Sequence, residues 1–444
     1  MKSTRLTCCA FTALLAVSVF PAQLTAQEQQ GQSQGHVHYF VKVLASLGGT
    51  ASAAEGINNK GWVAGDSNLP RDQTEHAVLW HDGVMTDLGT LGGLSSWANT
   101  INPSGLVVGG SEIDAVDPLG ENWGPYCTPS SGCQLERAYV WRDGVMTALP
   151  TLGGNNGTTL GFNGAVNNRG QGVGIAETAT RDPNCIPPQV LDSEAVIWGP
   201  EAGEIQELPL LPGDLFSGAV AISDQGHVVG GSGPTCGPPG TAGSVHAVLW
   251  QNGSAIDLGS LGGAMNNVAW AINNHDQIAG FSDLPGDQTT HAFLWQRGIM
   301  TDLGTLPGDV ASFAYSINER GQIVGQSLDS VGNSHSFLWQ DGVMTDLNTL
   351  TPPLSSLYVI QPFSINSESE IVGQAFDQNS GEVLPVLMIP CDEKHAHAAS
   401  CNDQAWSGTD TQGRSERPNV ILPESVREQL RTRRGFGQFA QLGR

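Results

Sequence analysis

Hydrophobic and polar residues alternate in short segments that recur along most of the chain. The clearest segment has the pattern Ile-Asn-x-x-Gly-x-x-Val-Gly-x-Ser, as in INERGQIVGQS. Seven copies of it start at Ile57, Ile101, Val166, Ile222, Ile272, Ile317 and Ile365. Such self-similarity is typical of repeat architectures in which each copy forms one supersecondary unit.

Two further segments complete a copy. A segment such as HAFLW (291–295) precedes an Asp-Gly or Asn-Gly pair, and a segment such as VMTDLG (84–89) follows that pair. Asn-x-x-Gly fits a four-residue turn and Asp-Gly a two-residue hairpin, so each copy predicts four strands. Four strands in about 45 residues match one propeller blade. We therefore expect an all-β fold, a seven-bladed β-propeller of four-stranded blades, over residues 39–390.

The two ends of the repeat region complement each other. Residues 40–49 (FVKVLASLGG) match residues 84–93 (VMTDLGTLGG), but no copy precedes them. The seventh copy, residues 353–390, has segments for three strands and lacks the fourth. We expect residues 40–47 to form the outer strand of the last blade, because this closes the ring and protects a strand edge.

Taken together, these motifs resemble the HAF-type bacterial extracellular repeat family. HAFLW (291–295), MTDLGTLPG (300–308) and INERGQIVGQS (317–327) carry the resemblance, which covers residues 39–390. The third copy has Glu194 where the pattern has His, and the seventh copy also lacks the His. The resemblance implies a secreted repeat protein of unknown biochemical role, and it supplies no catalytic residues.

Composition agrees with a fold rich in turns and excludes two classes of partner. The 444 residues include 57 Gly and 25 Pro, and only 14% are charged. Many short strands fit this composition better than helices do. The net charge of -24 argues against a nucleic acid and against an anionic membrane surface, because both repel an acidic protein. We expect a monomer without a membrane span.

The start of the chain reads as a secretory signal. Residues 1–26 combine basic Lys2 and Arg5 with the apolar run at 6–20. This run is short for a membrane span and typical of a signal peptide. We expect cleavage near Ala26, a polar spacer at 27–38, and a secreted or periplasmic protein.

The end of the chain, residues 391–444, predicts a C-terminal extension. A linker leads into LPESVREQLRTRRG (422–435), which has the start and stop signals of a basic helix. Leu422, Val426 and Leu430 form one apolar stripe on this helix. The stripe predicts docking on the acidic propeller or on a partner.

Six cysteines follow the signal segment, and an even number in an oxidising compartment suggests disulfides. Ordered by proximity, the predicted pairs are Cys127–Cys133, Cys185–Cys236 and Cys391–Cys401. Their spacing matches no zinc or redox motif, so no metal ligand is assigned.

Three residue types recur at fixed repeat positions. Aromatic side chains at one position predict packing of blade against blade: Trp80, Trp141, Trp198, Trp250, Trp295 and Trp339. Histidines at another position lie a blade or more apart, so they cannot share one metal ion, and structural hydrogen bonds are the favoured role: His76, His246, His291 and His335. Carboxylates in the fourth strands predict bonds to backbone groups: Asp87, Asp257, Asp302 and Asp346.

The loops between the second and third strands vary most and predict where ligands bind. In an up-and-down meander these loops share one face, and insertions on one face are typical of a binding face. The second and third copies carry insertions at 112–137 and 177–194. Carboxylates beside exposed aromatic side chains resemble a carbohydrate site. The candidate ligand-binding residues are Glu112, Asp114, Asp117, Glu121, Trp123, Tyr126, Arg181 and Asp182.

The leading hypothesis is a binding or interaction scaffold whose partner is a glycan or an extracellular protein. One alternative is a polysaccharide-active enzyme that uses loop carboxylates as acid and base. Another is a purely structural or adhesive surface protein, and the insertions can also be read as rigid acidic loops without a ligand. No catalytic residue and no cofactor is assigned, with calcium as an alternative at the acidic loops 66–76 and 282–291.

Overall fold

A computed structural model describes residues 38–123, 133–161, 164–201, 203–236, 245–352, 355–392, 401 and 420–427. The chain divides into Met1–His36 and Val37–Arg444, and all described residues belong to the second unit. The predicted signal peptide and most of the spacer lie outside the described residues. Within the described ranges, no helix has both the length and the apolar character needed to cross a membrane.

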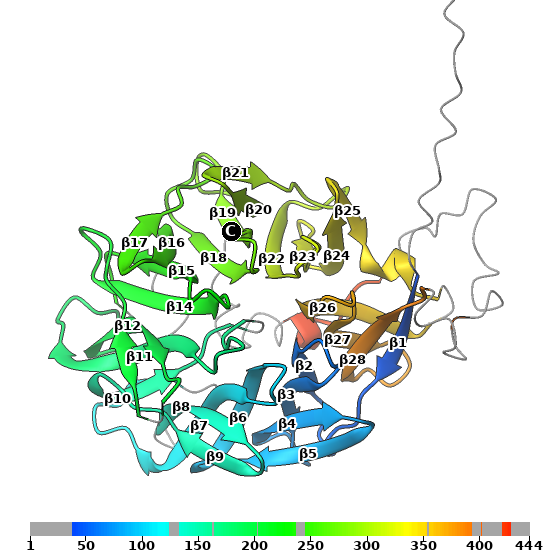
Figure 1. Ribbon diagram of the computed structural model, residues 1–444. Coiled ribbons are helices and arrows are strands. Elements are labelled where there is room, and N and C mark those ends of the chain that lie inside the picture. The colour runs from blue at the N-terminus through cyan, green and yellow to red at the C-terminus, as the bar shows by residue number, and fades with distance from the viewer. Residues whose placement is uncertain are drawn as a thin grey trace, which may run out of the picture. The chain divides into compact units, whose positions relative to one another are not determined.

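Seven antiparallel sheets of four strands form a ring of blades (Figure 1). Blade 1 comprises β2 (Ser52–Ile57), β3 (Val63–Asn68), β4 (Glu75–His81) and β5 (Val84–Gly89). Blade 2 comprises β6 (Gly92–Ile101), β7 (Val107–Val116), β8 (Gln134–Arg142) and β9 (Val145–Ala148). Blade 3 comprises β10 (Gly153–Thr158), β11 (Gly172–Arg181), β12 (Leu191–Trp198) and β13 (Ile205–Glu207). Blade 4 comprises β14 (Phe216–Ile222), β15 (Val228–Gly233), β16 (His246–Gln251) and β17 (Ser254–Asp257). Blade 5 comprises β18 (Asn267–Ile272), β19 (Ile278–Asp283), β20 (Thr290–Gln296) and β21 (Ile299–Asp302).

Blade 6 comprises β22 (Ala311–Ile317), β23 (Ile323–Leu328), β24 (Ser334–Gln340) and β25 (Val343–Asp346), followed by the 3-10 helix η1 (Leu347–Leu350). Blade 7 comprises β26 (Leu357–Ile365), β27 (Ile371–Asp377), β28 (Val383–Pro390) and the N-terminal strand β1 (Tyr39–Val43). The sequence prediction of a seven-bladed β-propeller is confirmed. Its predicted closure by the N-terminal strand is confirmed as well, but the strand spans Tyr39–Val43 and not residues 40–47.

The closing strand β1 is held along its whole length. It pairs antiparallel with β28 from Tyr39 opposite Pro390 to Val43 opposite Val386. The pairing is extended by a backbone hydrogen bond from Cys391 to His38 at 2.7 Å. Tyr39 is 1% exposed and packs in a core cluster shared by blades 6 and 7.

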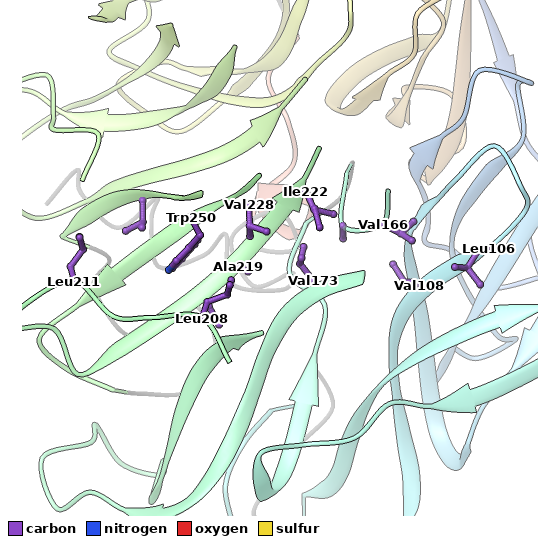
Figure 2. Close-up of a cluster of buried hydrophobic side chains, with 13 residues drawn as sticks. Leu106, Val108, Val166, Val173, Leu208, Leu211, Ala219, Ile222, Val228 and Trp250 are labelled. Atoms are coloured by element: carbon purple, nitrogen blue, oxygen red, sulfur yellow. The ribbon is translucent and has the colours of Figure 1, made fainter. Parts of the chain in front are cut away.

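The hydrophobic core lies mainly between neighbouring blades. One cluster joins Leu106 and Val108 of blade 2 with Val173 of blade 3 and Trp250 of blade 4 (Figure 2). Three of the repeat tryptophans also donate an indole N–H to the backbone just before their blade: Trp80 to Ala45, Trp198 to Pro150 and Trp250 to Pro209. These contacts confirm the predicted packing role. Trp141, Trp295 and Trp339 are only partly buried.

The Ile-Asn turns form one face of the ring, which we call the Asn-turn face. In blade 1 the side-chain oxygen of Asn58 accepts hydrogen bonds from the backbone of Lys60 and Trp62, which fixes the turn. Its amide donates to the carbonyl of Asn102 in blade 2 at 3.1 Å. The same link to the next blade recurs from Asn102, Asn167, Asn273, Asn318 and Asn366. Only blade 4 lacks this donor among the seven turns, because Ser223 stands at that position.

Each repeat histidine contacts the carboxylate of an aspartate, as expected for a structural hydrogen bond. His76 and His291 contact Asp87 and Asp302 in the fourth strand of their own blades, at 3.0 and 2.9 Å. His246 and His335 contact Asp214 and Asp309 instead, at 2.9 and 3.0 Å. The fourth-strand carboxylates also accept the predicted backbone hydrogen bonds, from Gly89, Gly259, Gly304 and Asn348.

Two of the three predicted disulfides are confirmed, Cys185–Cys236 and Cys391–Cys401. Cys133 is also disulfide-bonded, whereas its predicted partner Cys127 lies outside the described residues.

Residues 420–427 of the C-terminal extension dock on the propeller itself. Residues 424–427 are helical, and Leu422 and Val426 are 1% and 5% exposed. They pack against Tyr358, Ile360 and Phe376 of blade 7. This contact confirms the first of the two predicted docking sites. The rest of the predicted basic helix lies outside the described residues.

Candidate functional site

The blade ends opposite the Asn-turn face, where second and third strands connect, form what we call the variable-loop face. Toward this face the second strands of blades 2 and 3 are longer than that of blade 1, since β7 and β11 have 10 residues and β3 has 6. Each long strand leads into an insertion loop. The candidate site is the place where these two loops meet.

A chain of polar side chains joins the two insertion loops; we call it the interloop network. Asp117 of the blade 2 loop accepts a hydrogen bond from the amide of Asn156 at 2.8 Å, and the backbone of Asn156 donates to Glu177 at 2.9 Å. Gln189 of the blade 3 loop donates to Glu177 at 2.9 Å and accepts from the indole of Trp123 at 3.0 Å. The network therefore ties the two loops through buried side chains of both blades.

Glu121 adds a second connection between the loops. One of its oxygens accepts backbone hydrogen bonds from Val190 and Leu191 at 2.8 and 2.7 Å. Its other oxygen is buried and has no hydrogen-bond partner. Burial raises the pKa of Glu121 to about 7, and the nearby charges of Glu177 and Asp117 act in the same direction. The protonated form of Glu121 is therefore accessible near neutral pH.

Trp123 does not form the exposed stacking surface that the sequence predicts. Its side chain is 7% exposed and packs against Ile175, Phe216 and the Cys185–Cys236 disulfide. The prediction of an exposed aromatic here is wrong, because side chains of blades 3 and 4 cover the indole. Tyr126, the second predicted aromatic, lies outside the described residues.

Glu112 has a structural environment. It is 3% exposed and accepts a hydrogen bond from the backbone of Ser95 at 2.9 Å. Burial raises its pKa. Glu177 and Asp283 occupy the same repeat position and accept backbone hydrogen bonds from Asn155 and Asn266 in the same way. A carboxylate at this position therefore caps the start of the inner strand of its own blade.

The remaining predicted residues are divided between the surface and the network. Asp114 and Arg181 are exposed on the extended strands, and Asp182 is partly buried, with Asn184 donating to it at 2.8 Å. Asp117 and Glu121 join Trp123 at the network. Sequence reasoning missed Asn156, Glu177 and Gln189 as members. Glu177 had a signal, because it aligns with Glu112 after the Val-Gly-x-Ser segment, whereas Asn156 and Gln189 had none.

Calcium was an alternative at the acidic loops 66–76 and 282–291. One aspartate of each loop accepts hydrogen bonds from other groups of the protein. Asp72 accepts hydrogen bonds from the backbone and hydroxyl of Thr50 at 2.7 and 2.9 Å. Asp283 accepts from Thr290 at 2.6 Å. Calcium binding stays a prediction.

Comparisons with known proteins assign no family to this chain. No protein-family model matches the chain, and a search of curated proteins finds no match. Among solved structures, an acylaminoacyl peptidase from Pyrococcus horikoshii aligns with 11% identity and a TM-score of 0.45, over 73% of this chain and 49% of that chain. This chain thus spans about half the length of that peptidase.

Two further structures align at similar levels. The β-propeller domain of the Trilobed protease from Pyrococcus furiosus aligns with 10% identity and a TM-score of 0.38, over 67% of this chain and 81% of that domain. A gluconolactonase from Xanthomonas campestris aligns with 10% identity and a TM-score of 0.34, over 79% and 89% of the two chains. Likeness at these levels carries no argument about activity.

Proposed function

We propose that this chain is a secreted repeat protein of the HAF type, in the periplasm or outside the cell, that acts as a binding or interaction scaffold. Its partner is a glycan or an extracellular protein, and its binding surface is the variable-loop face around blades 2 and 3. Disulfides are compatible with an oxidising compartment.

The observation that carries this proposal is the difference between the two faces. On the Asn-turn face the turns are short, and six of the seven share one hydrogen bond to the next blade. On the variable-loop face the insertions of blades 2 and 3 are joined by the interloop network, and the loops of blades 3 and 4 by a disulfide. Loops held on a rigid scaffold are a common way of building a binding surface.

The environment of the carboxylates favours binding over catalysis. Asp117, Glu121 and Glu177 are at most 4% exposed, and all three accept hydrogen bonds from the protein. The exposed charged groups that a ligand would meet are instead Asp114 and Arg181.

A glycan array and a panel of extracellular proteins, probed with the full chain, test the proposal. We expect the double variant Asp114→Ala, Arg181→Ala to weaken binding of any ligand found. The matched control, Lys60→Ala with Asp82→Asn, changes one basic and one acidic residue, both exposed on the Asn-turn face, and should bind normally. Equal binding by both variants would place the surface elsewhere. Release of sugars from the bound glycans would support the enzyme alternative instead.

A further inference from the structure

Four side chains with metal-binding atoms meet where the loops of blades 3 and 4 are joined. One ligand atom from each of Asp182, Cys185, Asp192 and Cys236 lies within 4.8 Å of all the others. Three come from the blade 3 insertion and its following strand, and Cys236 comes from the blade 4 loop. In the oxidised protein the two sulfur atoms are bonded to each other and offer no thiolate.

The surroundings of the four residues are asymmetric. Cys185 and Cys236 are 7% and 1% exposed, and they pack against Trp123, Ile175 and Phe216. The two carboxylates are partly buried. One oxygen of Asp192 is inaccessible to solvent and has no hydrogen-bond partner. A buried carboxylate oxygen without a partner is costly, and a cation between the two carboxylates would satisfy it.

Backbone contacts keep the four residues together independently of the S–S bond. Ile186 of blade 3 donates a hydrogen bond to the carbonyl of Cys236 at 2.8 Å, which links the two blades beside the disulfide. Cys185 donates to the carbonyl of Asp182 at 3.3 Å, and Asp182 donates to Val190 at 3.1 Å. The four ligand groups are therefore expected to stay close when the disulfide is opened.

We propose that Asp182, Cys185, Asp192 and Cys236 form a zinc site in the reduced protein, so that either a disulfide or a zinc ion ties blades 3 and 4. Zinc prefers four ligands in a tetrahedron, with bonds of about 2.3 Å to sulfur and about 2.0–2.2 Å to carboxylate oxygen. Ligand atoms in such a site are about 3.3–3.8 Å apart by this geometry. The sulfurs must separate and the carboxylates approach by small movements of surface loops.

Reduction of the Cys185–Cys236 disulfide is a balanced reaction when a phosphine is the reductant. The phosphine gives two electrons to the S–S bond and becomes a phosphine oxide, while water supplies the oxygen atom and the two thiol protons. Zinc binding then releases both thiol protons to solvent, because the thiolate is the ligand. Calcium is disfavoured at this site, because it binds oxygen ligands and not thiolates.

Cobalt titration of the reduced full chain tests the site, since cobalt bound to thiolates absorbs in the near ultraviolet. We expect one cobalt per chain with this absorption, displaced by zinc. Cys236→Ser should abolish it and Asp192→Asn should weaken cobalt binding at least tenfold. Cys391→Ser, in the distant disulfide, is the matched control and should keep it. An unchanged signal in Cys236→Ser, or no stoichiometric binding by the reduced wild type, would overturn the proposal.

A second measurement covers variants that lose their fold. Zinc should raise the melting temperature of the reduced wild type and of Cys391→Ser, and should leave that of Cys236→Ser unchanged. Stabilisation of all three by zinc would place the metal elsewhere and overturn the proposal. Neither experiment depends on whether the variable-loop face binds a glycan or a protein.

Discussion

Asn366 of blade 7 donates its side-chain amide to the backbone carbonyl of Asn58 in blade 1, at 3.1 Å and across 308 residues of sequence. The same residue fixes its own turn, because its side-chain oxygen accepts hydrogen bonds from the backbone of Glu368 and Glu370. One side chain therefore shapes a turn and also joins the last blade to the first. The ring is closed twice, by this bond and by the pairing of β1 with β28.

Replacing Asn366 by Ala should lower the free energy of unfolding by about 1–3 kcal/mol, because the variant loses four side-chain hydrogen bonds at a buried position. Asn379→Ala is the matched control, since Asn379 is exposed in a loop of the same blade. It should change stability by less than about 0.5 kcal/mol. Urea unfolding of both variants measures the difference, and equal stabilities would show that the amide link contributes nothing.

Ser223→Asn should stabilise the protein. Ser223 already accepts a backbone hydrogen bond from His227, as the asparagines do in their turns, so the turn should tolerate the change. The new amide can then reach the carbonyl of Asn273 in blade 5. We expect a gain of about 0.5–1.5 kcal/mol, measured as a higher urea midpoint. Ser223→Ala serves as the comparison, and a loss of stability in both variants would contradict the prediction.

The repeat motifs predicted the fold because each motif residue has one environment that recurs in several blades. The Asn of Ile-Asn-x-x-Gly was predictable as a turn residue from local chemistry. Its second role, the bond to the next blade, was not predictable from the turn, because that bond depends on how the blades are placed. The same holds for His246 and His335, whose carboxylate partners lie outside the fourth strand.

The candidate site was less predictable, because the insertions do not recur in the other copies and no repeat pattern indicates their contacts. The composition of the blade 2 loop suggested an exposed aromatic, yet Trp123 is buried by contacts with blade 3 and the disulfide. Gln189, its hydrogen-bond partner, lies 66 residues away. Contacts of this kind depend on the path of a single loop, and neither periodicity nor local propensity encodes that path.

Tyr39→Ala should cost about 3–5 kcal/mol, as truncation of a buried aromatic does. Tyr39 starts the closing strand and is 1% exposed. Val43→Ala, at the other end of the same strand, is the control, because Val43 is 41% exposed. Thermal unfolding should show a large loss for the first variant and a small loss for the second. Similar small losses would mean that β1 contributes little to closure.

Trp123→Ala should also destabilise the protein by about 3–5 kcal/mol, the usual cost for a buried tryptophan. Trp123→Phe keeps most of the packing and loses the bond to Gln189, so it should cost less. Ile186→Ala, at an exposed residue of the adjoining loop, should be nearly neutral. Chemical unfolding ranks the three variants. A neutral Trp123→Ala would restore the interpretation that this side chain belongs to a ligand surface and not to the core.

Glu121 should make stability depend on pH. Its pKa in the folded protein is about 7, above the ordinary value of 4.5, because burial disfavours the charged form. The folded state therefore binds the proton more tightly than the unfolded state, and its stability falls as pH rises from about 4.5 to 7.

Glu121→Gln carries no titrating group, so the variant should lose this part of the pH dependence and be more stable than the wild type at pH 8. Asp114→Asn is the control, because Asp114 is exposed on the preceding strand and should leave the pH profile unchanged. Unfolding free energies of the three proteins between pH 5 and 8 give the comparison. If the unfolding free energy of Glu121→Gln changed with pH as much as that of the wild type, another group would be responsible for the pH dependence.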